Sequence, residues 1–139
     1  MNAQSPTTAS TPKRILVVDD NADIRNLISL ILTSESYEVL VAESGAELLE
    51  RIASFRPDLL LLDIMMPYMS GFEALESVRS LPDVHLNSIP VVMITAKSMD
   101  EDVDRASALG ASSYIVKPFR ADTLKEKVKA QLGQGALGR

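Results

Sequence analysis

Three aspartates stand directly after short apolar segments, which is an unusual place for a charged side chain. Asp19 and Asp20 follow the apolar residues 15–18, and Asp63 follows the four leucines at 59–62. Short apolar runs of this kind predict buried strands of a parallel sheet. Because the carboxyl ends of parallel strands form the ligand crevice of such a sheet, we expect the three carboxylates to lie close together. Crowded carboxylates repel each other, so they require a hard cation or shared protons.

Two further apolar runs end in polar side chains that suit the same chemistry. Thr95 follows residues 91–94, and Lys117 follows residues 113–116. A carboxylate beside Mg²⁺, a hydroxyl group and an ammonium group is the arrangement of a phosphoryl-transfer site. Asp63 would attack phosphorus and form an aspartyl phosphate. Mg²⁺ and Lys117 would neutralise charge on the transferred oxygens, and Thr95 would donate a hydrogen bond to one of them.

Apolar runs alternate with segments of helical periodicity along the chain, which predicts an α/β fold. Strict alternation favours right-handed crossovers and a doubly wound parallel sheet with helices on both faces. Ser44 with Glu47, and Ser70 with Glu73, form predicted capping boxes at the start of two helices. The loop at 81–89 contains His85, to which we assign no role. The expected strands are residues 14–18, 37–42 (more polar, as at a sheet edge), 59–62, 91–94 and 113–116.

The composition excludes several classes of function. The chain has 139 residues, enough for one domain, and its net charge of −5 argues against a nucleic-acid-binding surface. It contains no cysteine and a single histidine, which excludes disulfides, thiolate nucleophiles and a histidine-rich metal site. No apolar run is long enough to span a membrane, and residues 1–13 lack the apolar core of a signal peptide, so we expect a cytoplasmic location. We expect a disordered arm at 1–13, a folded domain at 14–132 and a flexible tail at 133–139.

The joint pattern of these residues resembles the receiver domain of two-component response regulators, the CheY-like family. The resemblance covers almost the whole chain, and the motifs that carry it are Asp19-Asp20, Asp63 with Pro67 and Gly71, Thr95-Ala96, and Tyr114 with Lys117-Pro118-Phe119. It implies a flavodoxin-like sheet of five strands in the order 2-1-3-4-5, and a cis bond before Pro118. It further implies a Mg²⁺ ion bound by Asp20, Asp63 and the Met65 backbone carbonyl, with Asp19 acting through water.

The resemblance also implies how the site would signal and where this chain departs from common patterns. Thr95 would move toward the phosphoryl group, and Tyr114 would turn inward to fill the space left behind. Ser112 and Ser113 replace acids that many dimerising receivers carry. In the family, the side chains at the positions of Met65 and Lys97 influence how fast water attacks the phosphoryl group. From the residues alone, Lys125, Lys127 and Lys129 are interpreted as a solvated helix face.

The expected function is therefore that of a stand-alone receiver, phosphorylated on Asp63 by a sensor histidine kinase or a histidine phosphotransfer protein. It would signal to a downstream protein target as a monomer or weak homodimer, without direct contact to nucleic acid or membrane. Two alternatives remain. One is an enzyme, a phosphatase or phosphotransferase that forms an aspartyl phosphate transiently, as in the haloacid dehalogenase-like hydrolases, which typically carry an acid where this chain has Met65. The other is an interaction module that takes no phosphate, which usually lacks one of the site residues.

Overall fold

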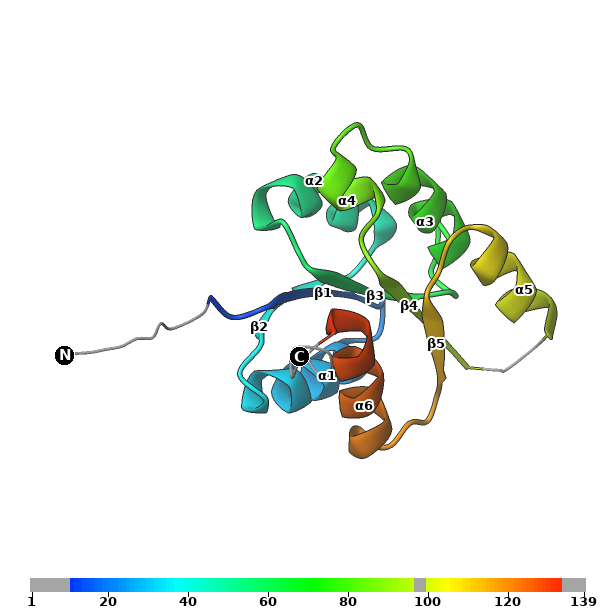
Figure 1. The fold of residues 1–139 in the computed structure, drawn as a ribbon. Helices are drawn as coiled ribbons and strands as arrows, with labels where there is room; N and C mark the ends of the chain where they lie inside the picture. Colours follow the sequence, from blue (N-terminus) through cyan, green and yellow to red (C-terminus); the bar gives the residue numbers. More distant parts are fainter. Residues whose placement is uncertain (1–10, 97–99, 134–139) are drawn as a thin grey trace.

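A five-stranded parallel sheet forms the centre of the molecule in a computed structural model that describes residues 11–96 and 100–133. Its strand order is β2-β1-β3-β4-β5, as the resemblance implied (Figure 1). β2 and β5 lie at the edges, which confirms the edge position expected for the more polar second strand. The strands are β1 (Arg14–Val18), β2 (Glu38–Ala42), β3 (Leu59–Asp63), β4 (Val91–Thr95) and β5 (Ser113–Val116).

Helices cover both faces of the sheet, so the expected doubly wound architecture is confirmed (Figure 1). One face packs against α1 and α6, and the opposite face packs against α2, α3 and α5. Because β3 and β4 are buried along their whole length, the carboxyl end of each strand is held firmly. The helices are α1 (Ala22–Ser34), α2 (Gly45–Phe55), α3 (Gly71–Arg79), α4 (Val84–Asn87), α5 (Asp100–Ala108) and α6 (Ala121–Leu132).

The two apolar layers follow from the alternation of side chains along each strand. Leu60 and Leu62 of β3 point into the layer under α2 and α3, while Leu59 and Leu61 point into the layer under α1 and α6. All four side chains are fully buried. Burial of one such side chain contributes about 1.5–3 kcal/mol relative to its exposed state, so the sheet supplies a rigid base for the groups at its edge.

The helix starts are capped largely as the sequence predicts. Ser70 and Glu73 form a complete capping box at α3. At α2, the Ser44 side chain accepts from the Glu47 amide, but the Glu47 carboxylate accepts from the amide of Glu43 instead of Ser44, so the predicted reciprocal box is wrong in that detail. At α1 the N-cap is Asn21, whose side chain accepts from the Ile24 amide.

Two expectations about local structure need correction. The predicted loop at 81–89 contains the short helix α4, whose N-cap is Asp83. Strands β3 and β4 each extend one residue further than expected, into Asp63 and Thr95. The pairing of the parallel strands therefore holds the backbone of Asp63 and Thr95, so the positions of their Cα atoms are fixed.

The structure does not describe most residues at the two ends of the chain. The predicted arm at 1–13 falls mostly on residues that the structure does not describe, and so does the predicted tail at 133–139. In the described part of the chain, no helix has both the length and the apolar character that crossing a membrane requires.

Candidate functional site

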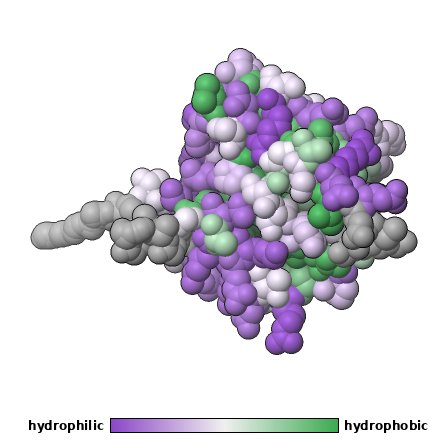
Figure 2. All heavy atoms as spheres, turned by 45° about the vertical axis from the view of Figure 1, so that its right-hand side comes forward, coloured by the Kyte–Doolittle hydropathy of each residue, from purple (hydrophilic) through white to green (hydrophobic). Residues whose placement is uncertain are grey.

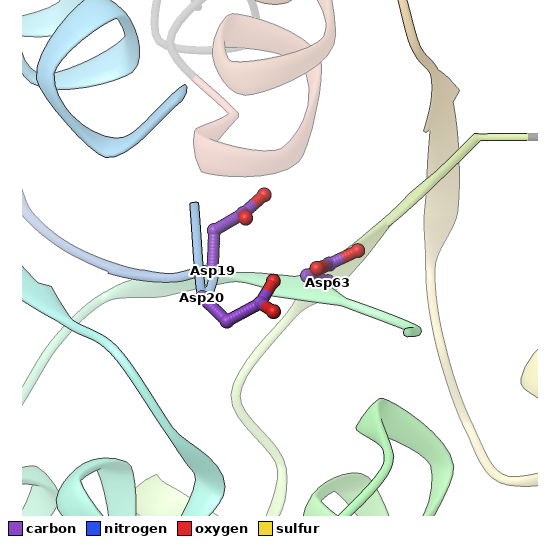
Figure 3. A group of neighbouring side chains, drawn as sticks. All are labelled: Asp19, Asp20 and Asp63. Carbon is purple, nitrogen blue, oxygen red and sulfur yellow. The ribbon is translucent and has the colours of Figure 1, made fainter. Parts of the chain in front are cut away.

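The ends of β1 and β3 bring three carboxylates together, as the sequence predicts. Asp19 and Asp20 directly follow β1, and Asp63 is the last residue of β3, which pairs with β1. Each residue offers a carboxylate oxygen, and these oxygens lie within 4.8 Å of one another (Figure 3). Asp19 and Asp63 are buried, while Asp20 is exposed at the rim. Three negative charges at this distance repel each other strongly unless a cation lies among them.

Lys117 supplies one positive charge to this cluster from the segment that follows β5. Its Nζ atom lies 2.9 Å from Asp19 Oδ2 and 3.6 Å from Asp63 Oδ1. Burial lowers the pKa of Lys117, but the hydrogen bond with Asp19 and the charges of Asp63 and Asp19 outweigh burial and raise it. Lys117 therefore lies beside the acids, where the sequence predicts it. The Lys117–Pro118 peptide bond is cis, as the resemblance implied.

One ammonium group does not balance the environment of Asp63. Burial, followed by the charge of Asp19, raises the pKa of Asp63 to about 7, although Lys117 and the Met65 amide act in the opposite direction. A nucleophilic carboxylate must be ionised, and near neutral pH this one is only partly so. A further positive charge close to Asp63 would therefore stabilise its ionised form.

The two carboxylate oxygens of Asp19 have different partners. Its Oδ1 atom accepts from the Asn21 amide at 2.9 Å. Its Oδ2 atom is buried and lies 2.9 Å from Lys117 Nζ, which is its charged partner.

The residues after Asp63 form the mouth of the site. The Met65 amide donates to Asp63 Oδ1 at 3.4 Å, so this backbone lies beside the cluster. The Met65 side chain is 71% exposed, whereas Met66 is buried. Tyr68 is fully exposed and has a φ of 69°, a backbone conformation that costs a non-glycine residue energy.

Gly71 closes this turn by direct backbone contact. Its amide donates to the Ile64 carbonyl at 2.8 Å. A Cβ atom at this position would meet the carbonyl oxygen of Asp63 and lie 2.8 Å from Cα of Ile64. Only glycine therefore allows α3 to start so close to the end of β3. This close approach fixes the position of Asp63, the last residue of β3.

The predicted switch residues lie on the neighbouring strands. Thr95 is buried at the end of β4, and Tyr114 is half-buried on β5. Tyr114 pairs with Met93, two residues before Thr95, so the side chains of Tyr114 and Thr95 lie on the same face of the sheet. The Lys117 amide donates to the Thr95 carbonyl at 2.6 Å, which ties the two strand ends together. Lys97 lies outside the described residues.

Sequence reasoning missed one contact near the switch. Lys127 of α6 donates to Ser113 Oγ at 3.2 Å and lies over the Tyr114 ring, so the lysine run is not uniformly solvated. The alternating charge pattern of α6 carries no sign of this contact, because Ser113 and Lys127 are 14 residues apart.

The donor set suits a hard divalent cation. Mg²⁺ prefers oxygen ligands and binds through one or two carboxylates while it keeps several waters. The cluster offers carboxylate oxygens only, and two of its three acids are buried. Asp19, Asp20 and Asp63 are the residues of this cluster that could hold such an ion.

Comparison with known proteins places these features in one family. The family model described as "Response regulator receiver domain" matches residues 15–129. The DNA-binding response regulator MtrA of Mycolicibacterium paratuberculosis is 37% identical over 120 residues, which are 86% of this chain and 51% of MtrA. The response regulator MprA of Mycobacterium ulcerans is 41% identical over 125 residues, 89% of this chain and 52% of MprA. The chain thus spans about half the length of these curated relatives.

Solved structures agree with the sequence comparison. The chemotaxis protein CheY4 of Vibrio cholerae superimposes with a TM-score of 0.83 at 33% identity, over 88% of this chain and 100% of that one. A CheY-like receiver domain protein of Methanospirillum hungatei gives a TM-score of 0.82 at 33% identity, over 93% of this chain and 100% of that one.

Proposed function

The chain belongs to the family of response regulator receiver domains, and from this premise we propose that it accepts a phosphoryl group on Asp63 and signals through Thr95 and Tyr114. The observation that carries the proposal is the cluster itself, in which Lys117 lies between Asp19 and Asp63 at the carboxyl edge of the sheet. Each residue alone has an ordinary structural explanation. Their convergence on one edge from four strand ends matches the needs of phosphoryl transfer.

The reaction transfers one phosphoryl group to one carboxylate oxygen. An oxygen of ionised Asp63 attacks phosphorus, and the bond from phosphorus to the donor, a histidine nitrogen of the partner, breaks. The electron pair of that bond stays with the donor nitrogen, and the product is an acyl phosphate on Asp63. Lys117 would pair with the phosphoryl oxygens, and the Thr95 hydroxyl would donate to one of them as it moves toward the group.

Mg²⁺ would be held by Asp20, Asp63 and the Met65 carbonyl, with Asp19 acting through water. Bound there, the ion would supply the positive charge that keeps Asp63 ionised and offsets the charge of the phosphoryl oxygens. This fits the raised pKa of Asp63, because burial and the charge of Asp19 disfavour the ionised carboxylate. It also gives a reason for the exposed position of Asp20, because a rim carboxylate can bind an ion that arrives from solvent.

The partners follow from the chemistry and not from the relatives' names. A receiver of this kind takes its phosphoryl group from a sensor histidine kinase or a histidine phosphotransfer protein, and it acts on a downstream protein target. DNA binding is stated for MtrA, of which this chain matches about half the length, so we do not extend it to the receiver. We propose that residues 14–132 act in the cytoplasm, as a monomer or weak homodimer.

The test is phosphorylation by a small donor. The protein is incubated with acetyl phosphate and Mg²⁺, and intact-mass spectrometry measures the gain of one phosphoryl group. We expect uptake by wild type and by Asp122→Asn, which changes an exposed acid in the first turn of α6, but not by Asp63→Asn. Uptake by Asp63→Asn at the wild-type level would overturn the assignment, and so would a wild type that takes up no phosphate from acetyl phosphate or phosphorylated histidine.

A further inference from the structure

Lys127 is the lysine of α6 that reaches across to β5. Its Nζ atom donates to Ser113 Oγ at 3.2 Å and lies 5.4 Å from the centre of the Tyr114 ring. The other two lysines of this helix behave differently. Lys125 lies 3.7 Å from Glu35, toward α1, and Lys129 is exposed. One lysine out of three therefore contacts both the switch aromatic and the residue before it.

Tyr114 lines two hollows, one on the side of α5 and one on the side of α6. On the side of α5, a cavity of about 180 Å³ is bounded by Val103, Ala106 and the backbone leading to Tyr114. On the side of α6, a larger hollow of about 370 Å³ is lined by Phe119, Lys127 and Tyr114 itself. The ring thus has room to move, and the position it takes depends on what holds it. Figure 2 turns the α5–β5 side forward and shows apolar patches between hydrophilic atoms on it.

A cation close to an aromatic face is attracted by the negative charge of the ring face. Contacts of Lys127 with both Ser113 and Tyr114 fix the ammonium group at two points, so it favours the ring orientation found here. Ala106 is the only buried residue of α5 among those with described side chains. Tyr114 packs against the apolar layer that includes Ala106 and Met93, so the contact with Lys127 is one of two interactions that set the position of the ring.

We propose that Lys127 is a positioning residue that holds Tyr114 toward α6 while Asp63 is unmodified, so that the inward turn of the ring requires loss of this contact. The proposal rests on the proposed function of Asp63. Because the site and the ring are coupled, whatever weakens the Lys127 contact raises the affinity of the site for a phosphoryl group or its mimic by the same factor. Neutralisation of one surface lysine would thereby shift the protein toward its active form.

The expected shift is modest and measurable. A cation–π contact at an exposed site corresponds to about a two- to five-fold change in the equilibrium between the two ring positions. Lys127→Met removes the charge and keeps the length of the side chain. Lys127→Arg keeps a cation over the ring, and Lys129→Met removes one charge from an exposed position on the same helix. Ser113→Ala removes the oxygen partner without changing α6.

The experiment uses two readouts on protein labelled with 3-fluorotyrosine. The first is the fluorine resonance of Tyr114 in the unmodified protein, and the second is the affinity for beryllofluoride with Mg²⁺. We expect Lys127→Met to move the Tyr114 resonance toward its position in beryllofluoride-bound wild type and to tighten binding about two- to five-fold. Lys127→Arg and Lys129→Met should match wild type. Ser113→Ala should give a smaller shift in the same direction, which keeps the proposal testable if Lys127→Met does not fold.

The proposal is overturned if Lys127→Met leaves both the resonance and the affinity unchanged, or if Lys129→Met changes them equally. Its failure is distinguishable from failure of the proposed function. Wild type that binds no beryllofluoride contradicts the role of Asp63, whereas the Tyr114 resonance of the unmodified variants still reports whether Lys127 positions the ring.

Discussion

The carboxyl group of Asp63 is held in a protein environment that favours its neutral form. Its pKa is raised to about 7 from an ordinary value of 3.8, first by burial and second by the charge of Asp19. The folded protein therefore binds a proton at Asp63 more tightly than the unfolded chain does. Between about pH 4 and pH 7, the contribution of Asp63 to stability falls as pH rises, because ionisation of Asp63 costs more in the folded state.

We predict that Asp63→Asn removes this dependence. In chelator-treated protein at pH 8, the variant should be more stable than wild type by about 1–3 kcal/mol, and the difference should shrink as pH falls toward 4. Urea unfolding at a series of pH values measures both free energies of unfolding. Parallel curves for the two proteins across this range would show that Asp63 does not carry the raised pKa.

At the scale of elements, the contact between the end of β3 and the start of α3 controls where Asp63 lies. Gly71→Ala places a methyl group against the backbone of Asp63 and Ile64, which cannot move aside as a side chain can. We predict a loss of about 1–3 kcal/mol in the free energy of unfolding, the usual cost of overpacking. The rate of phosphorylation should fall as well, because displacement of this backbone also moves Asp63, the proposed nucleophile.

Gly45→Ala is the matched control. Gly45 is also the first residue of its helix, but its added Cβ would meet the flexible side chain of Met69. Met69 can adopt another rotamer, so this variant should stay within about 1 kcal/mol of wild type. Urea denaturation and a phosphorylation time course on both variants compare the two. Equal losses in both variants would mean that helix starts in general, and not the contact with Asp63, determine the effect.

The elements that could be predicted from sequence are those whose pattern is local. Leu59 to Leu62 form an unbroken apolar run, and such a run allows few alternatives to a buried strand. Helix α4 was missed because four residues between Pro82 and Pro90 are too short to show a helical period. The acids Asp19, Asp20 and Asp63 were predicted to meet because parallel strands align their ends. The contact of Lys127 with Tyr114 was not predictable, since it depends on how α6 is rotated against β5.

At the scale of the whole molecule, a net charge of −5 and a cluster of three acids make the fold responsive to cations. We predict that Mg²⁺ raises the melting temperature by mass action. At a concentration 100-fold above Kd the gain is about 2.7 kcal/mol, which corresponds to roughly 10 °C for a domain of this size. Asp20→Asn should weaken this response without lowering the stability of the metal-free protein, because it removes one of the repelling charges.

Differential scanning calorimetry with and without Mg²⁺ measures the response. Asp23→Asn is the control, since Asp23 is an exposed acid in the first turn of α1 and lies outside the cluster. It should respond to Mg²⁺ as wild type does. An equal Mg²⁺ response in Asp20→Asn and wild type would remove Asp20 from the set of ligands.

The order of the strands has a consequence for the growing chain. All three acids belong to the first 63 residues, directly after β1 and at the end of β3, two strands that pair, while Lys117 follows more than 50 residues later. At about 5–20 residues per second, the ribosome presents the acids several seconds before their ammonium partner emerges. Until then Lys117 cannot offset the repulsion between the carboxylates. We therefore expect the pairing of β1 with β3 to reach its full stability only when the segment after β5 is present.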